Sequence, residues 1–204
     1  MSTEGASYRP IKFLDKMEGN KHIVLLYDIE KYADLVIAQY LLNGLQKGES
    51  CIFFTSDKPE TIEERLLVKG INVDSYKRTN SLRVFCIESS DTNNKLDALE
   101  TLKSISEEAT QGMKPPYRFV CRTITDTGTI AGMNLELVVE KTAHEHFGEF
   151  NNSQLCYYDI SGIEQSKRDK WIRELLKNHH YVIYASEPEK AVAFETMLLE
   201  PDEE

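Results

Sequence analysis

The sequence predicts a three-layer α/β domain, in which helices cover both faces of a mainly parallel sheet of about six or more strands. Short apolar runs alternate with longer segments of helical pattern along most of the chain. The runs are apolar at successive positions rather than at alternate ones, which is typical of strands that are covered on both faces. Strands and helices that alternate in this way form right-handed crossover units and build a doubly wound sheet.

The predicted strands are rich in Val, Ile, Phe and Tyr. They are His22–Tyr27, Cys51–Ser56, Leu82–Glu88, Tyr117–Ile124, Gln154–Ile160 and Tyr181–Ala185. Four of these strands contain one cysteine each, and no Cys-x-x-Cys pair of the kind found in metal sites occurs. We therefore interpret the cysteines as small buried hydrophobic residues.

The segments between the strands carry helix start and stop signals. A proline can occupy the first turn of a helix, a glycine can close its end, and Ser-x-x-Asp or Ser-x-x-Glu resembles a capping box. The expected helices are Lys31–Gln46, Pro59 to Gly70, Asn93 to Gly112, Met133 to Phe147, one from Ser166-x-x-Asp169 and a last one from Ser186-x-x-Glu189.

The length of 204 residues is that of one domain. We expect a short lead-in over residues 1–20, the α/β domain over residues 21–197 and an acidic tail over residues 198–204. The formal net charge of -10 disfavours nucleic acid and anionic membrane surfaces as partners, since both need clustered Lys and Arg. No apolar run is long enough to span a membrane, and no secretory leader pattern occurs, so we expect a cytoplasmic protein.

The turn after the first strand is where a doubly wound protein would hold a phosphate group. Here it reads Tyr27-Asp28-Ile29-Glu30 and contains no glycine. The two carboxylates would occupy the positive end of the following helix and would repel a triphosphate. The sequence therefore predicts no conventional nucleotide phosphate site at this turn.

The ends of the other strands supply further candidates. Tyr27 and Tyr158 have aromatic rings with hydroxyl tips that suit a small organic ligand, although aromatic residues in strands are more often core. Arg122 would either reach a cleft or pair with Asp126 or Asp159. Asp159 could hold magnesium, but a turn cap is the more common role.

Two histidine pairs are candidates for metal ligands. His144 and His146 stand two positions apart and would point to different faces of a helix. His179 and His180 precede a strand and are interpreted as a polar turn. We expect no metal ion and no other cofactor.

The first third of the chain carries a resemblance to a known family. The stretch His22-Ile23-x-Leu25-x-Tyr27, the run Gly44-Leu45-Gln46-Lys47-Gly48-Glu49, the strand Cys51–Thr55 and the turn Gly70-Ile71-Asn72-Val73 resemble the MEDS family of sensory domains. The same region is similar to RecA-like ATPases of the circadian-clock type, but without their phosphate loop. The resemblance implies a RecA-like fold that has lost ATP binding and senses small hydrocarbon derivatives, with His22 and Tyr27 as pocket residues; a structural role for His22 is equally open.

The function predicted from this resemblance is a non-catalytic, stand-alone sensor or adaptor. Its candidate ligand residues are His22, Tyr27, Asp28, Arg122, Tyr158 and Asp159. Its partners would be a small organic ligand and another protein or a second copy of the chain. The alternative is a degenerate RecA-like interaction module that docks on a true ATPase or on itself. A third possibility is an enzyme that uses Arg122, Asp126 and Asp159, for which no substrate can be named.

Overall fold

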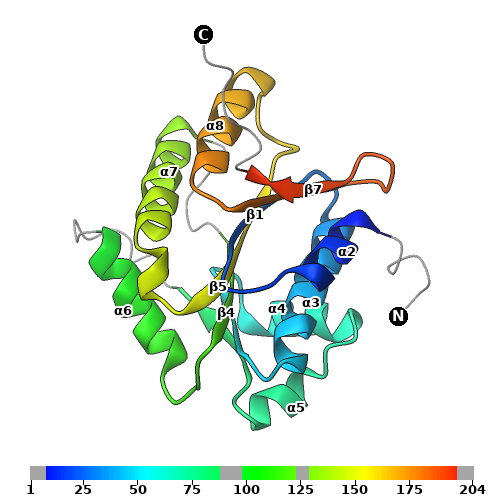
Figure 1. Ribbon diagram of the computed structural model, residues 1–204, viewed down its shortest axis with the longest axis vertical. Helices are drawn as coiled ribbons and strands as arrows, with labels where there is room; N and C mark the ends of the chain where they lie inside the picture. Colours follow the sequence, from blue (N-terminus) through cyan, green and yellow to red (C-terminus); the bar gives the residue numbers. More distant parts are fainter. Residues whose placement is uncertain (1–7, 88–97, 123–128, 197–204) are drawn as a thin grey trace.

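The computed structural model describes residues 8–87, 98–122 and 129–196, and in these ranges the chain forms a seven-stranded sheet between two layers of helices (Figure 1). The strands lie in the order β3-β2-β4-β5-β1-β6-β7, and every neighbouring pair is parallel except β6 and β7. This order confirms the predicted doubly wound, mainly parallel α/β fold.

The six predicted strands are all present, and a seventh is added. Their bounds are β1 His22–Tyr27, β2 Ser50–Thr55, β3 Leu82–Cys86, β4 Tyr117–Arg122, β5 Asn152–Asp159, β6 Tyr181–Ala185 and β7 Val192–Glu195. The strands β1 and β2 are buried at every position, as their continuous apolar runs predict.

The helices divide between the two faces of the sheet. One face is covered by α2 Arg9–Lys16, α3 Glu30–Gln46, α4 Pro59–Val68 and α5 Val73–Arg78; the other is covered by α6 Ala98–Thr110, α7 Ile130–Glu145 and α8 Gln165–Lys177, with a short 3-10 turn η1 at Phe147–Glu149 (Figure 1). No helix in the described ranges has the length and apolar character that a membrane crossing requires.

Alternate residues of the central strand β1 belong to different cores. Ile23, Leu25 and Tyr27 pack against α2, α3 and α4, whereas Val24 and Leu26 pack against α7 and α8. This period of two is that of any strand, and it decides which side chains can meet. His22 lies two positions before Val24, so its side chain belongs to the face that α7 and α8 cover.

The end of the chain departs from the sequence-based prediction. Residues after Ser186 were expected to begin a helix, but they form a turn followed by β7, which pairs antiparallel with β6. The alternation of Ala193 toward one core and Phe194 toward the other explains why a strand is favoured here. The capping box at Ser166 is also wrong, because α8 begins one residue earlier and Glu164 is its N-cap.

Two further local predictions can be compared with the structure. Pro59 opens α4, and Gly70 follows its end with a φ of +90°, a left-handed conformation that glycine adopts readily. The cysteines all lie in strands, but only Cys51 and Cys156 are buried and Cys86 is exposed, because β3 is an edge strand. The predicted N-cap Asn93 lies outside the described residues.

Candidate functional site

The carboxyl ends of β1 and β5 mark the place where the winding of the sheet reverses. The two strands are parallel neighbours, and Tyr27 is in register with Asp159. The helix α3 that follows β1 packs on one face of the sheet, and α8, which follows β5, packs on the other. Ligands of doubly wound domains bind at such a point, outside the carboxyl ends of the strands.

Asp28 occupies the position that would begin a phosphate loop. Its exposed carboxylate accepts hydrogen bonds from the Tyr184 hydroxyl at 2.6 Å and from the Ser186 hydroxyl at 3.3 Å. These two partners come from the end of β6, the neighbour of β1. A fixed carboxylate therefore stands where an ATPase would expose backbone amides to a phosphate.

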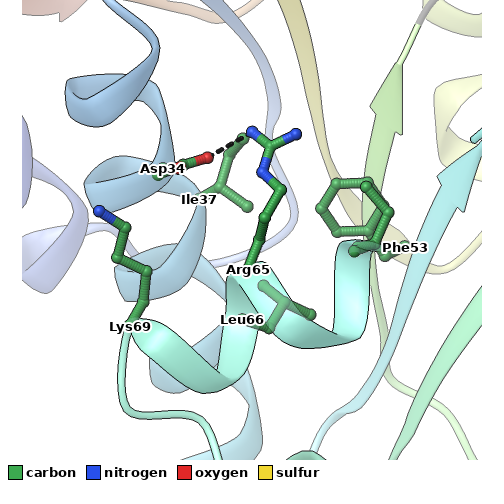
Figure 2. A pocket seen from close by; sticks show the side chains of 7 residues that line it. Asp34, Ile37, Phe53, Arg65, Leu66 and Lys69 are labelled. Carbon is green, nitrogen blue, oxygen red and sulfur yellow. Dashed lines mark hydrogen bonds and ion pairs between the residues drawn. The ribbon is translucent and has the colours of Figure 1, made fainter. Parts of the chain in front are cut away.

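Glu30, the second acid of this turn, lies in the first turn of α3 and is also paired. The Arg65 guanidinium lies 2.9 Å from Glu30 and 2.5 Å from Asp34, and it ties α4 to the start of α3. Figure 2 shows Arg65 reaching Asp34 above a pocket whose volume is about 10 Å³. Such a space holds one water molecule and is too small for an organic ligand.

Asp159 forms a local cap at the end of β5. It accepts hydrogen bonds from the backbone amide of Ser161 at 2.8 Å and from the hydroxyl of Ser161 at 2.7 Å. Arg122 ends β4 and is in register with Tyr157, but its side chain lies outside the described part of the chain, as does Asp126. The predicted ion pair of Arg122 is thus outside what the structure describes.

Tyr27 and Tyr158 were expected to line one pocket, and the structure does not bring them together. Tyr27 packs in the core below α3, with its ring 6.4 Å from that of Tyr157. Tyr158 packs on the opposite face of the sheet, with its ring 5.2 Å from that of Trp171. Tyr27, Asp28 and Asp159 therefore lie together at the carboxyl edge, whereas the side chain of Tyr158 lies on the other face of the sheet.

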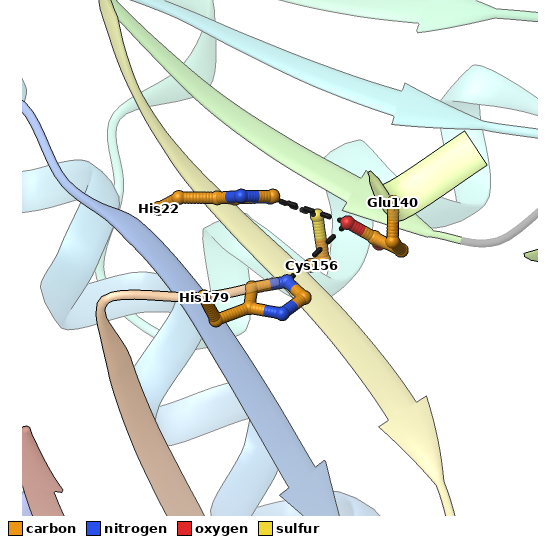
Figure 3. A group of neighbouring side chains, drawn as sticks. All are labelled: His22, Glu140, Cys156 and His179. Atoms are coloured by element: carbon orange, nitrogen blue, oxygen red, sulfur yellow. Dashed lines mark hydrogen bonds and ion pairs between the residues drawn. The ribbon is translucent and has the colours of Figure 1, made fainter. Parts of the chain in front are cut away.

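His22 lies at the amino end of β1, far from that edge, in a cluster of four buried polar side chains. The cluster consists of His22, Glu140, Cys156 and His179, contributed by β1, α7, β5 and the residue pair that precedes β6 (Figure 3). Figure 3 shows the four side chains pointing toward one another. His179, which the sequence places in a polar turn, is therefore buried.

The distances within this His–Glu–Cys–His cluster are short. Glu140 Oε2 lies 3.2 Å from His22 Nε2 and 3.3 Å from His179 Nε2, and Cys156 Sγ lies 3.5 Å from His22 Nε2. Four atoms, one from each side chain, all lie within 4.8 Å of one another. A metal ion is one group that such a donor set can hold.

Neighbouring groups orient the cluster. His179 Nδ1–H donates to the carbonyl of Leu175 at 2.7 Å, which directs Nε2 inward. The Tyr158 hydroxyl donates to Glu140 Oε1 and lies 2.8 Å from Glu136, which leaves Glu140 Oε2 facing the two histidines.

Burial and mutual charge set the protonation of the cluster. Burial alone would raise the pKa of Glu140, but His179 and His22 hold that pKa well below its usual value. Burial would lower the pKa of His179, and the Glu140 carboxylate raises it to about 10. Burial, reinforced by His179, lowers the pKa of His22 to about 4. The cluster thus contains one ion pair and one neutral imidazole at neutral pH.

Sequence reasoning missed this cluster because its members are far apart in the chain and match no ligand spacing. One signal was present in the helical segment. Glu136 and Glu140 lie four residues apart on the same face as Met133 and Ala143, and all four are buried. Carboxylates on the apolar face of a helix must find polar partners inside the protein.

Known proteins support both the fold and the family. The family model described as "MEthanogen/methylotroph, DcmR Sensory domain" (MEDS) matches residues 21–180. A Pyrococcus horikoshii OT3 protein from a structural study superposes with a TM-score of 0.59 at 12% identity, over 91% of each chain. A KaiC-like protein of the same hyperthermophilic archaeon gives a TM-score of 0.55 at 12% identity, over 80% of this chain and 71% of that one. No curated protein matches. At such identities the two structures show the fold alone, which is RecA-like.

Proposed function

Because this chain belongs to the MEDS family of sensory domains, we propose that it binds a small organic ligand at the carboxyl edge of its sheet and signals without hydrolysing nucleotide. The observation that carries the proposal is Asp28, whose carboxylate is held by Tyr184 and Ser186 at the end of the central strand. An anion at this position opposes binding of a triphosphate. The response would pass to a partner protein or to a second copy of the chain.

The side chains at this edge favour a particular kind of ligand. Asp28 and Asp159 are exposed carboxylates at the ends of adjacent strands. Carboxylates accept hydrogen bonds and attract positive charge, so a small ligand that donates hydrogen bonds fits better than an anion. Tyr27, buried below the same edge, supplies an apolar wall.

Isothermal titration calorimetry tests the proposal. The full chain is titrated with ATP and Mg²⁺, and then with methanol, methylamine and dichloromethane as one-carbon probes suggested by the family. We expect no heat of binding with ATP and saturable binding of a probe that Asp28→Asn weakens by about tenfold, the loss of one charge-assisted hydrogen bond.

Asp74→Asn is the matched control, because Asp74 is exposed in the first turn of α5 and lies at neither β1 nor β6. It should leave probe binding unchanged. Micromolar binding of ATP would contradict the proposal, and so would probe binding that is identical in the wild type and in Asp28→Asn.

A second candidate function is a RecA-like module that docks on another protein. Leu135 and Val138 lie three residues apart on α7, and 50% and 54% of their surfaces are exposed. Leu67 and Val68 at the end of α4 are also exposed. Exposed apolar pairs on a helix suit a protein contact. Light scattering that finds only monomers, together with a failure to bind any ATPase partner, would count against this candidate.

A further inference from the structure

The geometry points to a zinc site formed by His22, Glu140, Cys156 and His179, at the amino end of the sheet and apart from the proposed ligand edge. This inference stands independently of the proposed sensing of organic ligands. Two imidazoles, one thiolate and one carboxylate are all ligands that Zn²⁺ accepts, and four protein ligands close a tetrahedral structural site.

The spacing of the donor atoms fits such a site. Zinc lies about 2.0–2.1 Å from nitrogen and about 2.3 Å from sulfur, so tetrahedral ligand atoms stand about 3.3–3.8 Å apart. Three of the separations in the cluster are 3.2, 3.3 and 3.5 Å, and none of the others exceeds 4.8 Å. Side-chain shifts of about 1 Å would bring the longer separations to the tetrahedral value.

Two of the facing atoms lie close together without forming an aligned hydrogen bond. Glu140 Oε2 and His179 Nε2 form an ion pair at 3.3 Å, but neither atom makes a hydrogen bond of ordinary geometry. Both side chains are buried, with exposures of 4% and 0%. Buried polar atoms without aligned partners are costly in a folded protein, and a metal ion at their centre would satisfy both.

Two of the four ligands, His179 and Glu140, are held from behind by hydrogen bonds of the kind found in metal sites. Leu175 accepts a hydrogen bond from His179 Nδ1, and Tyr158 donates one to Glu140 Oε1. Such second-layer contacts fix the ligand orientation in known zinc sites. The charges also balance, since Zn²⁺ with one thiolate and one carboxylate has no net charge and can be buried without a further counter-ion.

Two further imidazoles lie beside the cluster. His144 and His180 are both partly exposed, and their ring centres are 5.0 Å apart. The His144 ring stacks on that of His22 at 5.7 Å, and the backbone amide of His22 donates to His180 Nδ1 at 2.9 Å. These partly exposed imidazoles therefore lie beside the cluster and beside one another, without being ligands in the proposed set.

Metal analysis and spectroscopy on the full chain test the site. The protein is stripped with a chelator, mixed with an equimolar amount of Zn²⁺ and passed through a desalting column, and its zinc is measured by mass spectrometry. We expect about one zinc per chain, and X-ray absorption should show one sulfur near 2.3 Å and nitrogen or oxygen ligands near 2.0–2.1 Å. Cobalt(II) should give the absorption band of a cobalt–thiolate bond.

Variants identify the ligands. Cys156→Ser should abolish the cobalt–thiolate band and weaken zinc binding by about 100-fold or more. Cys86→Ser and His146→Gln are the matched controls, because Cys86 is exposed on β3 and His146 pairs with Glu149 outside the cluster. Tyr158 is a positioning residue, because it contacts the ligand Glu140. Tyr158→Phe should weaken zinc binding about 10–100-fold while the zinc–sulfur bond persists.

Several results would overturn the assignment. Wild-type protein that keeps no zinc after desalting would do so, as would an absorption spectrum without a sulfur ligand. Wild-type zinc affinity in Cys156→Ser would also contradict it. If that variant does not fold, X-ray absorption on the wild-type protein decides the matter alone.

Discussion

Gly44 on α3 lies directly against the side chain of Arg118 on β4. A Cβ at position 44 would stand 2.6 Å from both Cδ and Nε of Arg118 and 3.0 Å from Cys51 Sγ. Arg118 cannot move aside freely, because its guanidinium donates to Glu49 and to the carbonyl of Tyr40. The glycine therefore makes room for a buried arginine.

Gly44→Ala should destabilise the protein by about 1–3 kcal/mol, because the new methyl group overpacks this contact. An ordinary glycine in a helix would instead gain about 1 kcal/mol on the same change. Urea unfolding of the two proteins measures the difference. In an Arg118→Ala background the substitution should be neutral or stabilising; a stabilising effect in the wild-type background would contradict the reason given.

Glu49, in the turn between α3 and β2, forms a buried ion pair with Arg118 on β4. Their side chains are 15% and 4% exposed, and Glu49 Oε2 lies 2.6 Å from Arg118 Nε. Glu49→Gln leaves the guanidinium without its counter-charge inside the protein, and we expect a loss of about 3 kcal/mol in the free energy of unfolding.

The pair Lys77–Glu63 provides the control for this prediction. Lys77 is 47% exposed, so Glu63→Gln should cost less than about 1 kcal/mol. The free energies of unfolding are measured by chemical denaturation in the same buffer. Equal losses in Glu49→Gln and Glu63→Gln would show that burial does not make the Glu49 ion pair more stabilising than the exposed one.

These contacts give a physical reason for a run of residues that was matched to the family only by its pattern. In the run Gly44-Leu45-Gln46-Lys47-Gly48-Glu49, Gly44 admits Arg118, Gly48 adopts a φ of +79° after the helix, and Glu49 pairs with Arg118. The run was recognised as a pattern, but Arg118 is 69 residues away from Glu49, and no local rule connects them.

The fold was predictable because it depends on local patterns, whereas the candidate sites depend on register. Apolar runs identified β1 to β6, and the segments of helical pattern between them identified α3, α4, α6, α7 and α8, but α2 and α5 were not predicted. The assignment of Tyr27 and Tyr158 to one pocket failed because the two lie on opposite faces of the sheet. The strand β7 was missed because Ser186-x-x-Glu189 resembles a capping box and so predicts a helix, and because the four residues of β7 are at the lower limit for a recognisable alternation.

The buried hydroxyl of Tyr8 should make the stability of the protein depend on pH in the alkaline range. Burial, the main cause, raises the pKa of Tyr8 from 10.0 to about 12, and the hydroxyl donates to the carbonyl of Ser186 at 2.8 Å. The folded state holds this proton more tightly than the unfolded state. The contribution of the Tyr8 hydroxyl to the free energy of unfolding is therefore complete below about pH 10, and it is lost as the pH rises toward 12.

Tyr8→Phe should cost about 1 kcal/mol at pH 7, the value of one hydrogen bond. The difference between the variant and the wild type should shrink between about pH 10 and pH 12. Urea unfolding at a series of pH values measures it. Stability curves that stay parallel over this range would show that the Tyr8 proton is not held by the fold.

The exposed pair Leu135 and Val138 on α7 yields a prediction about association. A double substitution to glutamate places two charges on a surface that is at least half exposed, so the free energy of unfolding should change by less than about 0.5 kcal/mol. If the pair forms a contact between copies of the chain, the same change should convert dimers to monomers in light scattering. Substituting Leu67 and Val68 on α4 tests the other exposed pair in the same way. Dimers that persist in both double variants would exclude both surfaces as the contact, because two buried charges in an interface are destabilising.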